Sequence, residues 1–310
     1  MTLPQAPPTT ADDFNRTFEQ VKNWGRWGAD DQRGTLNLIT KQASARAAAL
    51  VTEGHTVSCA HPIPVVPTAT NRMPANRAVL AAGDVAGPGW GVAMDQTTIA
   101  PHGFATSHMD ALCHIFWDRQ MYNGFPASRM TSRGAEVCAI DVAREGIVGR
   151  GVLLDVPRAL GKGFLAGGEA ILPEDLDATE QRQGIRVEEG DILLVYTGRA
   201  RRERGESEAP TFRGAAGLHM STMPWLHERG VALLGCDGVS DVLPGGNEAC
   251  VQPVHACAIV AMGLHLLDNL SLEPLADACA ERNRWTFQLV VAPLIIKRGT
   301  GSAVNPIAIF

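Results

Sequence analysis

Three histidines and one aspartate lie close together in HGFATSHMDALCHIFW, residues 102–117. In a strand, side chains at positions i and i+2 point to the same face, so His108 and Asp110 could converge on one ion. A helix would separate these two side chains by about 200° around its axis. His114 stays near in either case, because it keeps the strand parity or lies one helical turn from Asp110.

Two imidazoles and a carboxylate suit a borderline divalent metal such as zinc, manganese or iron. Ring nitrogens and a hard oxygen are ligands that all three ions accept. The HxDxxxH spacing is moderately specific, and side chains that are only hydrogen-bonded within a core would produce it too. From the spacing alone, a metal-centred reaction site and a buried histidine-rich strand both remain open.

A second candidate segment is VHACAIVAMGLHLLDNL, residues 254–270. A helix is predicted from 254 to 262, Gly263 can end it, and the following residues alternate as in a strand up to Asp268. An unbroken helix would hold His255 and Asp268 roughly 20 Å apart. Both side chains can reach one site only if Gly263 turns the chain back.

The elements that must position these residues mix helices with many short strands, which indicates an α/β fold class. Helices are predicted where apolar residues follow helical spacing or alanine is abundant, and strands where short apolar runs lie between turn residues. The helices are expected within 11–24, 41–51, 174–181, 220–229 and 254–262, and the strands within 56–66, 91–99, 151–156, 190–198, 230–237 and 287–296.

The composition limits the partners that the protein can have. A formal net charge of −6 argues against a surface that neutralises nucleic-acid phosphates or docks on anionic lipid. No apolar run approaches the roughly 18 residues that span a bilayer, and LVVAPLII, residues 289–296, suits a buried strand. A small molecule is the expected partner, with no nucleic acid and no membrane.

Residues 1–12 are rich in Pro and Thr and predict a flexible N-terminal tail that lacks the features of a secretory signal. Residues 13–310 are long and apolar enough for one domain. Seven cysteines without a CxxC pair favour reduced core thiols and a cytoplasmic protein. The mixed-charge run RARRERGESE, residues 199–208, predicts a solvated loop or helix face.

The stretch TSHMDALCH, followed later by VH and LLDNL, resembles the cyclase family of metal-dependent hydrolases, which includes bacterial kynurenine formamidase and isatin hydrolase. Further matches are WGADDQRGTLN, GVLLDV, GDILLVYTG, GVALLGCDGVSD and APLIIKRGTGSAVNPIAIF, so the resemblance covers nearly the whole chain. It places the chain in the longer branch of that family. It implies an α/β fold with a swivelling β/β/α core, a mixed sheet and barrel-like elements, assembled as a homodimer or homotetramer.

The family motif runs roughly HxGTHxDxPxH, and its positions can be transferred to this chain. By position, the resemblance implies that His108 and Asp110 are metal ligands and that His114 is the catalytic general acid/base. It implies that His255 and Asp268 are the distal metal ligands.

Two positions depart from the family pattern. The first histidine of the motif falls on Phe104, and the usual distal Glu is the shorter Asp268, so one divalent ion, Mn or Zn, is expected rather than two. His102 keeps strand parity with Phe104 and is a candidate replacement ligand. His219 is a candidate for substrate contact, with a structural role as its alternative. Asp237, Ser240 and Asp241 in GCDGVSD recur in the family pattern near the distal ligands, and we expect them to form turns and to support the ligands.

The implied activity is hydrolysis of a C–N bond in a cyclic amide, imide or N-formyl aryl substrate, with water activated by the ion and His114 as proton carrier. The aromatic residues Phe104, Phe116, Trp117 and Tyr122 either wall a pocket for a flat ring or pack in the core.

Three other functions remain open. A lactone hydrolase would place nearly the same demands on the site. A non-haem iron oxygenase would use His108, Asp110 and His255 as its facial triad, although the predicted helices at 220–229 and 254–262 count against the usual jelly roll. A small-molecule binder without turnover would also fit the departures at Phe104 and Asp268.

Overall fold

The structure is a computed structural model that describes residues 5–205 and 214–310 of the chain. Its strands are β1 (Thr56–Ser58), β2 (Asn76–Ala81), β3 (Met94–Thr98), β4 (His108–Asp110), β5 (Met130–Thr131), β6 (Gly134–Ala135), β7 (Ile147–Asp155), β8 (Ala170–Ile171), β9 (Ile192–Tyr196), β10 (Gly217–Leu218), β11 (Leu233–Cys236), β12 (Leu266–Asp268), β13 (Thr286–Val291), β14 (Gly301–Ala303) and β15 (Ile307–Ile309).

The helices lie mostly between these strands. The α-helices are α1 (Ala11–Gln20), α2 (Lys41–Ala48), α3 (Val156–Ala159), α4 (Pro173–Gln183), α5 (Arg199–Gly205), α6 (Met223–Arg229), α7 (Pro253–His255) and α8 (Glu273–Arg282). The 3-10 helices are η1 (Gly34–Leu38), η2 (Gly83–Val85), η3 (Tyr122–Gly124), η4 (Ala127–Arg129), η5 (Ile140–Ala143) and η6 (Met220–Thr222), and the π-helix is η7 (Ala256–Met262).

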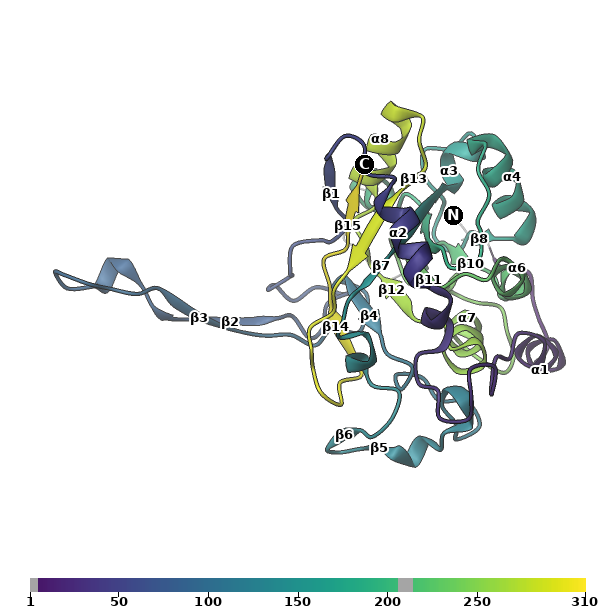
Figure 1. The fold of residues 1–310 in the computed structure, drawn as a ribbon, viewed down its shortest axis with the longest axis horizontal. Helices are drawn as coiled ribbons and strands as arrows, with labels where there is room; N and C mark the ends of the chain where they lie inside the picture. Colours follow the sequence, from purple (N-terminus) through teal and green to yellow (C-terminus); the bar gives the residue numbers. More distant parts are fainter. Residues whose placement is uncertain (1–4, 206–213) are drawn as a thin grey trace.

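A curled mixed sheet of nine strands is the centre of the described fold, in the order β1-β15-β13-β7-β9-β11-β12-β4-β14 (Figure 1). The strands from β7 to β12 in this order run parallel to their neighbours, and the flanking pairs are antiparallel. The strands β7, β9 and β11 are buried at nearly every position, as is typical of parallel strands that are covered on both faces. The α/β class and the mixed sheet that the sequence predicts are confirmed.

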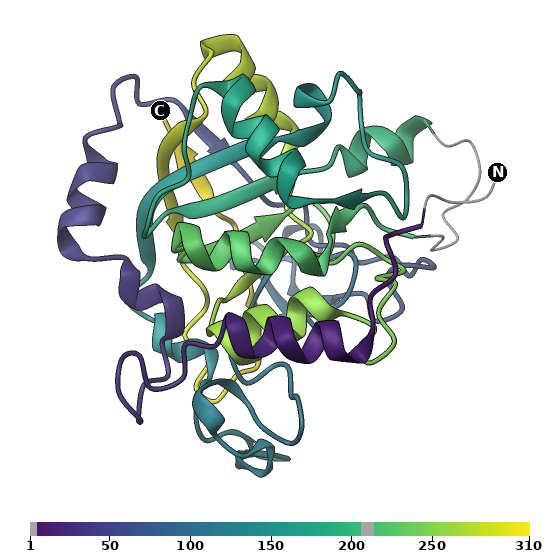
Figure 2. The same ribbon diagram turned by 90° about the vertical axis from the view of Figure 1, so that its right-hand side faces the viewer.

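Helices cover the sheet close to the segment that carries His255. α1, η7 and α6 lie against one another, and α1 is seen beside η7 in Figure 2. The helix α1 begins with a capping box between Thr10 and Asp13, and it buries Phe14 and Phe18. None of the described helices is both long and apolar enough to cross a bilayer.

Most of the predicted helices and strands are present, and the exceptions have physical reasons. The predicted strand 287–296 ends at Val291 because Pro293 cannot donate a hydrogen bond to the sheet. Residues 294–296, expected to be buried, are exposed. Of the predicted strand 56–66, only Thr56–Ser58 form a strand, β1. Pro62 and Pro64 cannot donate hydrogen bonds to the sheet and interrupt the rest of the run.

The prediction of a flexible tail over residues 1–12 disagrees with the part that the structure describes. The Thr9 amide donates to the Gly246 carbonyl at 2.9 Å, and Ala6 is buried. The Pro7 carbonyl lies 3.1 Å from Nε2 of His219. These contacts pack the segment before α1 against the rest of the chain, and residues 1–4 lie outside the described part.

Candidate metal centre

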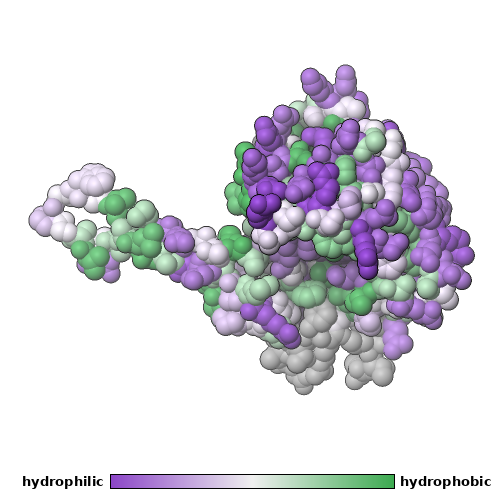
Figure 3. Space-filling view, turned by 90° about the horizontal axis from the view of Figure 1, so that it is seen from below, coloured by the Kyte–Doolittle hydropathy of each residue, from purple (hydrophilic) through white to green (hydrophobic). Residues whose placement is uncertain are grey.

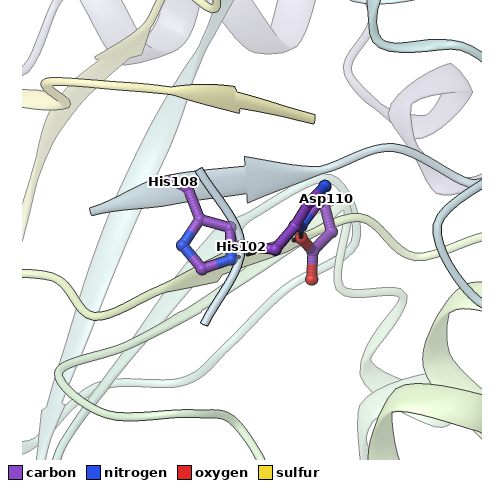
Figure 4. A group of neighbouring side chains, drawn as sticks. All are labelled: His102, His108 and Asp110. Carbon is purple, nitrogen blue, oxygen red and sulfur yellow. Dashed lines mark hydrogen bonds and ion pairs between the residues drawn. The ribbon is translucent and has the colours of Figure 1, made fainter. Parts of the chain in front are cut away.

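The strand β4 places His108 and Asp110 on one face inside the sheet. It lies between β12 and β14, with His108 opposite Asp268 on one side and Ala303 on the other. Figure 4 shows both side chains on the same side of the strand. The distance from His108 Nε2 to Asp110 Oδ1 is 3.3 Å, so the expectation from the spacing is confirmed.

The turn at Gly263 brings the distal segment back to β4. Gly263 ends η7 in the left-handed conformation, with φ of 69°, and a Cβ there would lie 2.4 Å from the Tyr122 ring. The chain then enters β12. His255 Nε2 lies 3.2 Å from Asp268 Oδ2 and 3.7 Å from Asp110 Oδ2, so all three residues face one point.

The hydrogen bonds of His108 and His255 fix which ring nitrogen is free. Nδ1 of His108 lies 2.7 Å from the Thr106 carbonyl, which can only accept, so this nitrogen carries the proton. Nδ1 of His255 is bonded to Oδ2 of Asp241. In the neutral tautomer that these bonds favour, each Nε2 directs its lone pair toward Asp110, as metal-ligating histidines require.

His102 and His114 complete one side of the group. Nδ1 of His102 lies 2.8 Å from Asp110 Oδ1, and Nε2 lies 3.0 Å from Thr300 Oγ1. The rings of His102 and His114 stack with 3.7 Å between centroids, and His114 Nε2 is 4.0 Å from Asp110 Oδ1. Gly301 makes room for this arrangement, because a Cβ there would lie 2.6 Å from the His102 ring.

The donor atoms fit a divalent cation. Two sets of residues each offer three potential ligand atoms that lie within 4.8 Å of one another. One set is His102, His108 and Asp110, and the other is Asp110, His255 and Asp268. Oδ2 of Asp110 is buried without a hydrogen-bond partner. A carboxylate oxygen that is buried without a hydrogen-bond donor is costly, and a bound metal ion would offset this cost.

The pKa values of Asp110 and His255 also indicate that the buried carboxylates attract positive charge. Burial alone would raise the pKa of Asp110, but hydrogen bonds from His102 and His108 hold it well below its ordinary value. Burial alone would lower the pKa of His255, but the charge of Asp268 and the contact with Asp241 raise it well above 6.5. The carboxylates attract a cation, and protons and a metal ion compete for these imidazoles.

His114 differs from the other histidines of the group. Burial lowers its pKa to about 4, and this effect outweighs the attraction of Asp110. The imidazole is therefore neutral at pH 7 and has a nitrogen that can accept a proton.

Residues of the GCDGVSD segment support the distal ligands, as the sequence predicts. Ser240 Oγ donates to Asp268 Oδ1 at 2.8 Å. Asp241 accepts the amides of Val254 at 2.7 Å and His255 at 3.1 Å, besides holding the His255 ring. This carboxylate thus fixes both the backbone and the side chain of one ligand.

We expect Asp241→Ala to weaken metal binding by about 10- to 100-fold, because His255 loses the acceptor that orients its ring. Calorimetric titration of metal into the chelator-treated protein would measure this change. Asp241→Asn keeps the acceptor oxygen and serves as the matched control, with a smaller expected loss. An unchanged affinity in both variants would contradict the positioning role.

Arg199 and Asn269 are functional neighbours that the sequence analysis missed. Asn269 follows Asp268 with φ of 55°, a conformation that asparagine tolerates, and its side chain donates to the Gly103 carbonyl at 2.7 Å. Arg199 donates to Asn269 Oδ1 at 2.7 Å and to the Phe104 carbonyl at 2.8 Å. Together they clamp the loop that follows His102.

The prediction that residues 199–208 form a solvated face is wrong for Arg199. Its side chain is 19% exposed, and its backbone amide donates to Asp237. Further along α5, Arg201 and Arg204 pair with Glu273, and residues 206–208 lie outside the described part. The asparagine after the aspartate in LLDNL was the available sequence signal for this clamp, because asparagine often occurs in left-handed turns.

Phe104 borders two adjoining cavities near His102. The larger, about 350 Å³, is lined by residues 69–73, Ala100 and 102–106, and the smaller, about 210 Å³, shares Thr70, Phe104 and Ala105 with it. The phenyl ring carries no ligand atom, and its position between the two cavities fits a role in a pocket wall.

The other aromatic candidates lie elsewhere. Trp117 packs on Phe14, Tyr122 is buried with its hydroxyl bonded to Asp31, and Phe116 is exposed. The structure does not bring His219 into the ligand group either. Its ring nitrogens contact Ser221 and the Pro7 carbonyl, which favours the structural alternative.

His265 makes stability depend on pH. It is fully buried, Nδ1 bonds to the Asp110 carbonyl, Nε2 has no partner, and burial lowers its pKa to about 4. The unfolded chain, with a pKa near 6.5, binds more protons between these values, so the free energy of unfolding falls as pH drops from 6.5 toward 4.

We therefore expect His265→Asn, which keeps a donor for Asp110, to reduce this pH dependence by about 2 kcal/mol between pH 7 and pH 5. Urea unfolding of the metal-free wild type and variant at both values would measure it. Parallel pH profiles would show that His265 does not titrate as the structure implies.

Comparisons with known proteins agree with this fold. A family model described as "Putative cyclase" matches residues 16–241. A crystal structure of a novel cyclase is 30% identical, with 94% of this chain and 99% of that chain covered and a TM-score of 0.84. No curated protein matches significantly.

Two structures of lower sequence identity are similar to this chain in fold. Isatin hydrolase A from Labrenzia aggregata, bound to benzyl benzoate, is 21% identical with a TM-score of 0.59 and covers 86% of this chain and 97% of its own. A predicted metal-dependent hydrolase from Bacillus stearothermophilus is 17% identical with a TM-score of 0.51 and covers 82% and 97%.

Proposed function

Because the chain belongs to the cyclase family, we propose that it is a metal-dependent hydrolase that cleaves a C–N bond in a small cyclic amide, imide or N-formyl aryl substrate. The observation that carries this proposal is the unpartnered Oδ2 of Asp110, which lies among imidazole nitrogens and a second carboxylate. A buried carboxylate oxygen without a hydrogen-bond donor is uncommon, and a cation among these groups would account for it.

One divalent ion, manganese or zinc, is the proposed cofactor, held by His108, Asp110, His255 and Asp268. When bound, such an ion makes a water molecule a better nucleophile at neutral pH and polarises the substrate carbonyl. His102, whose Nδ1 contacts Asp110, is proposed as a further ligand. In this arrangement the ligands come from three segments, the sheet strands β4 and β12 and the helix α7.

His114 is proposed to move the proton. It is neutral at pH 7, so it can accept a proton from the attacking water and donate it to the leaving nitrogen. Its stacking on His102 fixes the ring plane. The aromatic wall at Phe104 beside His102 favours a flat substrate, which would lie over the ligand group from the larger cavity.

The test combines metal analysis with substrate screening. Protein purified without chelator should contain about one manganese or zinc ion per chain. A pH-indicator screen over formanilides, cyclic imides, isatin-like rings and lactones should detect hydrolysis that chelation abolishes and the metal restores. Turnover of lactones alone would replace the C–N assignment, and a metal-free protein that hydrolyses none of these compounds would refute the proposal.

A further inference from the structure

The ring of His102 is held at both of its nitrogens, and the two contacts differ in kind. Nδ1 lies 2.8 Å from Asp110 Oδ1, and Nε2 lies 3.0 Å from Thr300 Oγ1. Asp110 is a proposed metal ligand with a carboxylate, whereas the Thr300 side chain is an uncharged hydroxyl. This hydroxyl therefore faces the ring nitrogen that does not contact the candidate metal centre.

The sheet places the Thr300 hydroxyl beside this ring. The Ala111 amide donates to the Thr300 carbonyl at 3.0 Å, and the next residue, Gly301, pairs with Asp110 between β14 and β4. A Cβ at Gly301 would lie 2.6 Å from Cε1 and 3.0 Å from Nε2 of His102, so glycine leaves the space that the ring occupies. Strand pairing thus sets the distance between the hydroxyl and His102.

The two partners of His102 have different hydrogen-bonding capacities. An ionised carboxylate such as Asp110 can only accept, whereas the Thr300 hydroxyl can both donate and accept. Without an ion, the neutral ring of His102 donates its Nδ1 proton to Asp110 and accepts the hydroxyl proton at Nε2. For Nδ1 to bind an ion, the single ring proton must lie on Nε2, and that proton needs an acceptor. The hydroxyl supplies this acceptor when it rotates about its C–O bond.

We propose that Thr300 is a positioning residue that makes Nδ1 of His102 a metal ligand. This inference rests on the proposed metal-dependent function. His108 and His255 present Nε2 to the centre, and each has Nδ1 bonded to an oxygen acceptor. His102 has the opposite orientation, so its acceptor must face Nε2, which is where Thr300 lies. Nδ1 of His102 and Nε2 of His108 both lie within 3.3 Å of Asp110 Oδ1, so both nitrogens can reach one ion.

Calorimetric titration of zinc and manganese into the chelator-treated full chain tests this inference without reference to hydrolysis. Thr300→Val keeps the shape of the side chain but removes the acceptor, so the metal dissociation constant should rise by at least about 10-fold. Thr300→Ser keeps the hydroxyl and should restore most of the affinity. Thr97→Val is the matched control, because Thr97 is exposed on β3, and it should leave the dissociation constant unchanged. Circular dichroism of each metal-free variant checks that it remains folded.

A double-mutant cycle tests whether Thr300 acts through His102. His102→Ala should weaken metal binding by at least as much as Thr300→Val does. In the His102→Ala background, Thr300→Val should cause no further loss, because the ring that the hydroxyl holds is already absent. Losses that add would show that Thr300 affects the centre by another route, and the inference would be wrong.

Nitrogen-15 NMR of the zinc-loaded wild type shows directly where the ring proton of His102 lies. The proton should be on Nε2, with Nδ1 bound to zinc. A zinc-loaded His102 protonated on Nδ1, or a Thr300→Val variant that binds metal as tightly as the wild type, would overturn this inference and leave the proposed centre intact. A wild type that binds neither zinc nor manganese would overturn both.

Discussion

His114→Ala is expected to lower kcat by about 10²- to 10⁴-fold while the metal content per chain stays the same. The imidazole is neutral at pH 7 because burial lowers its pKa to about 4, so it can act as a proton acceptor. Its Nε2 lies 4.0 Å from Asp110 Oδ1, beside the proposed ligands but outside both sets of converging ligand atoms. Loss of the ring should therefore remove the proton carrier and leave the ion in place.

Steady-state kinetics and elemental analysis of the same preparation separate these effects. His55→Ala is a suitable control, because His55 is exposed and remote from the ligand group in sequence. A variant with normal metal content and an unchanged kcat would remove His114 from the mechanism. A variant that loses the metal would instead show that His114 is a ligand.

The local geometry of the centre could be predicted because simple periodicities determine it. A strand period of two brings His108 and Asp110 to one face, and the left-handed turn at Gly263 returns Asp268 to His255. These rules require only neighbouring residues. The prediction for Asp241 came instead from the resemblance to the family pattern near the distal ligands.

The position of His102 could not be predicted from such local rules. Its strand parity with Phe104 suggested that it could approach the site, yet residues 102–107 form no strand, and Gly103 has a φ of 122°. His102 reaches Asp110 because a loop is clamped by Arg199 and Asn269, residues 97 and 167 positions away in the chain. Contacts at this separation cannot be derived from local spacing.

The hairpin that β2 and β3 form was not predicted from the sequence, for a different reason. The run 91–99 predicts a strand correctly, but its partner, NRAVLA, has neither clean alternation nor a tight turn before β3. The hairpin is also apolar and mostly exposed (Figure 3), which contradicts the expectation that apolar strands lie in a core.

Asp110→Asn should have the largest effect on the metal. Asp110 is the one residue common to both sets of potential ligand atoms, and it faces His102, His108 and His255. Replacing one carboxylate oxygen with an amide nitrogen removes a ligand and half of the charge that the two buried carboxylates Asp110 and Asp268 provide. We expect metal affinity to fall by more than the roughly 10- to 100-fold cost of losing an outer partner of a ligand.

Titration calorimetry with manganese and zinc would measure this loss, and hydrolysis should fall with metal occupancy. Asp118→Asn is the matched control, because Asp118 is exposed and lies just eight positions further along the chain. Since the same substitution also removes the negative charge beside His108, the metal-free variant should show this imidazole protonating at lower pH by NMR. A variant that binds metal as tightly as the wild type would mean that the orphaned carboxylate oxygen faces no ion, and the proposed centre would have to be abandoned.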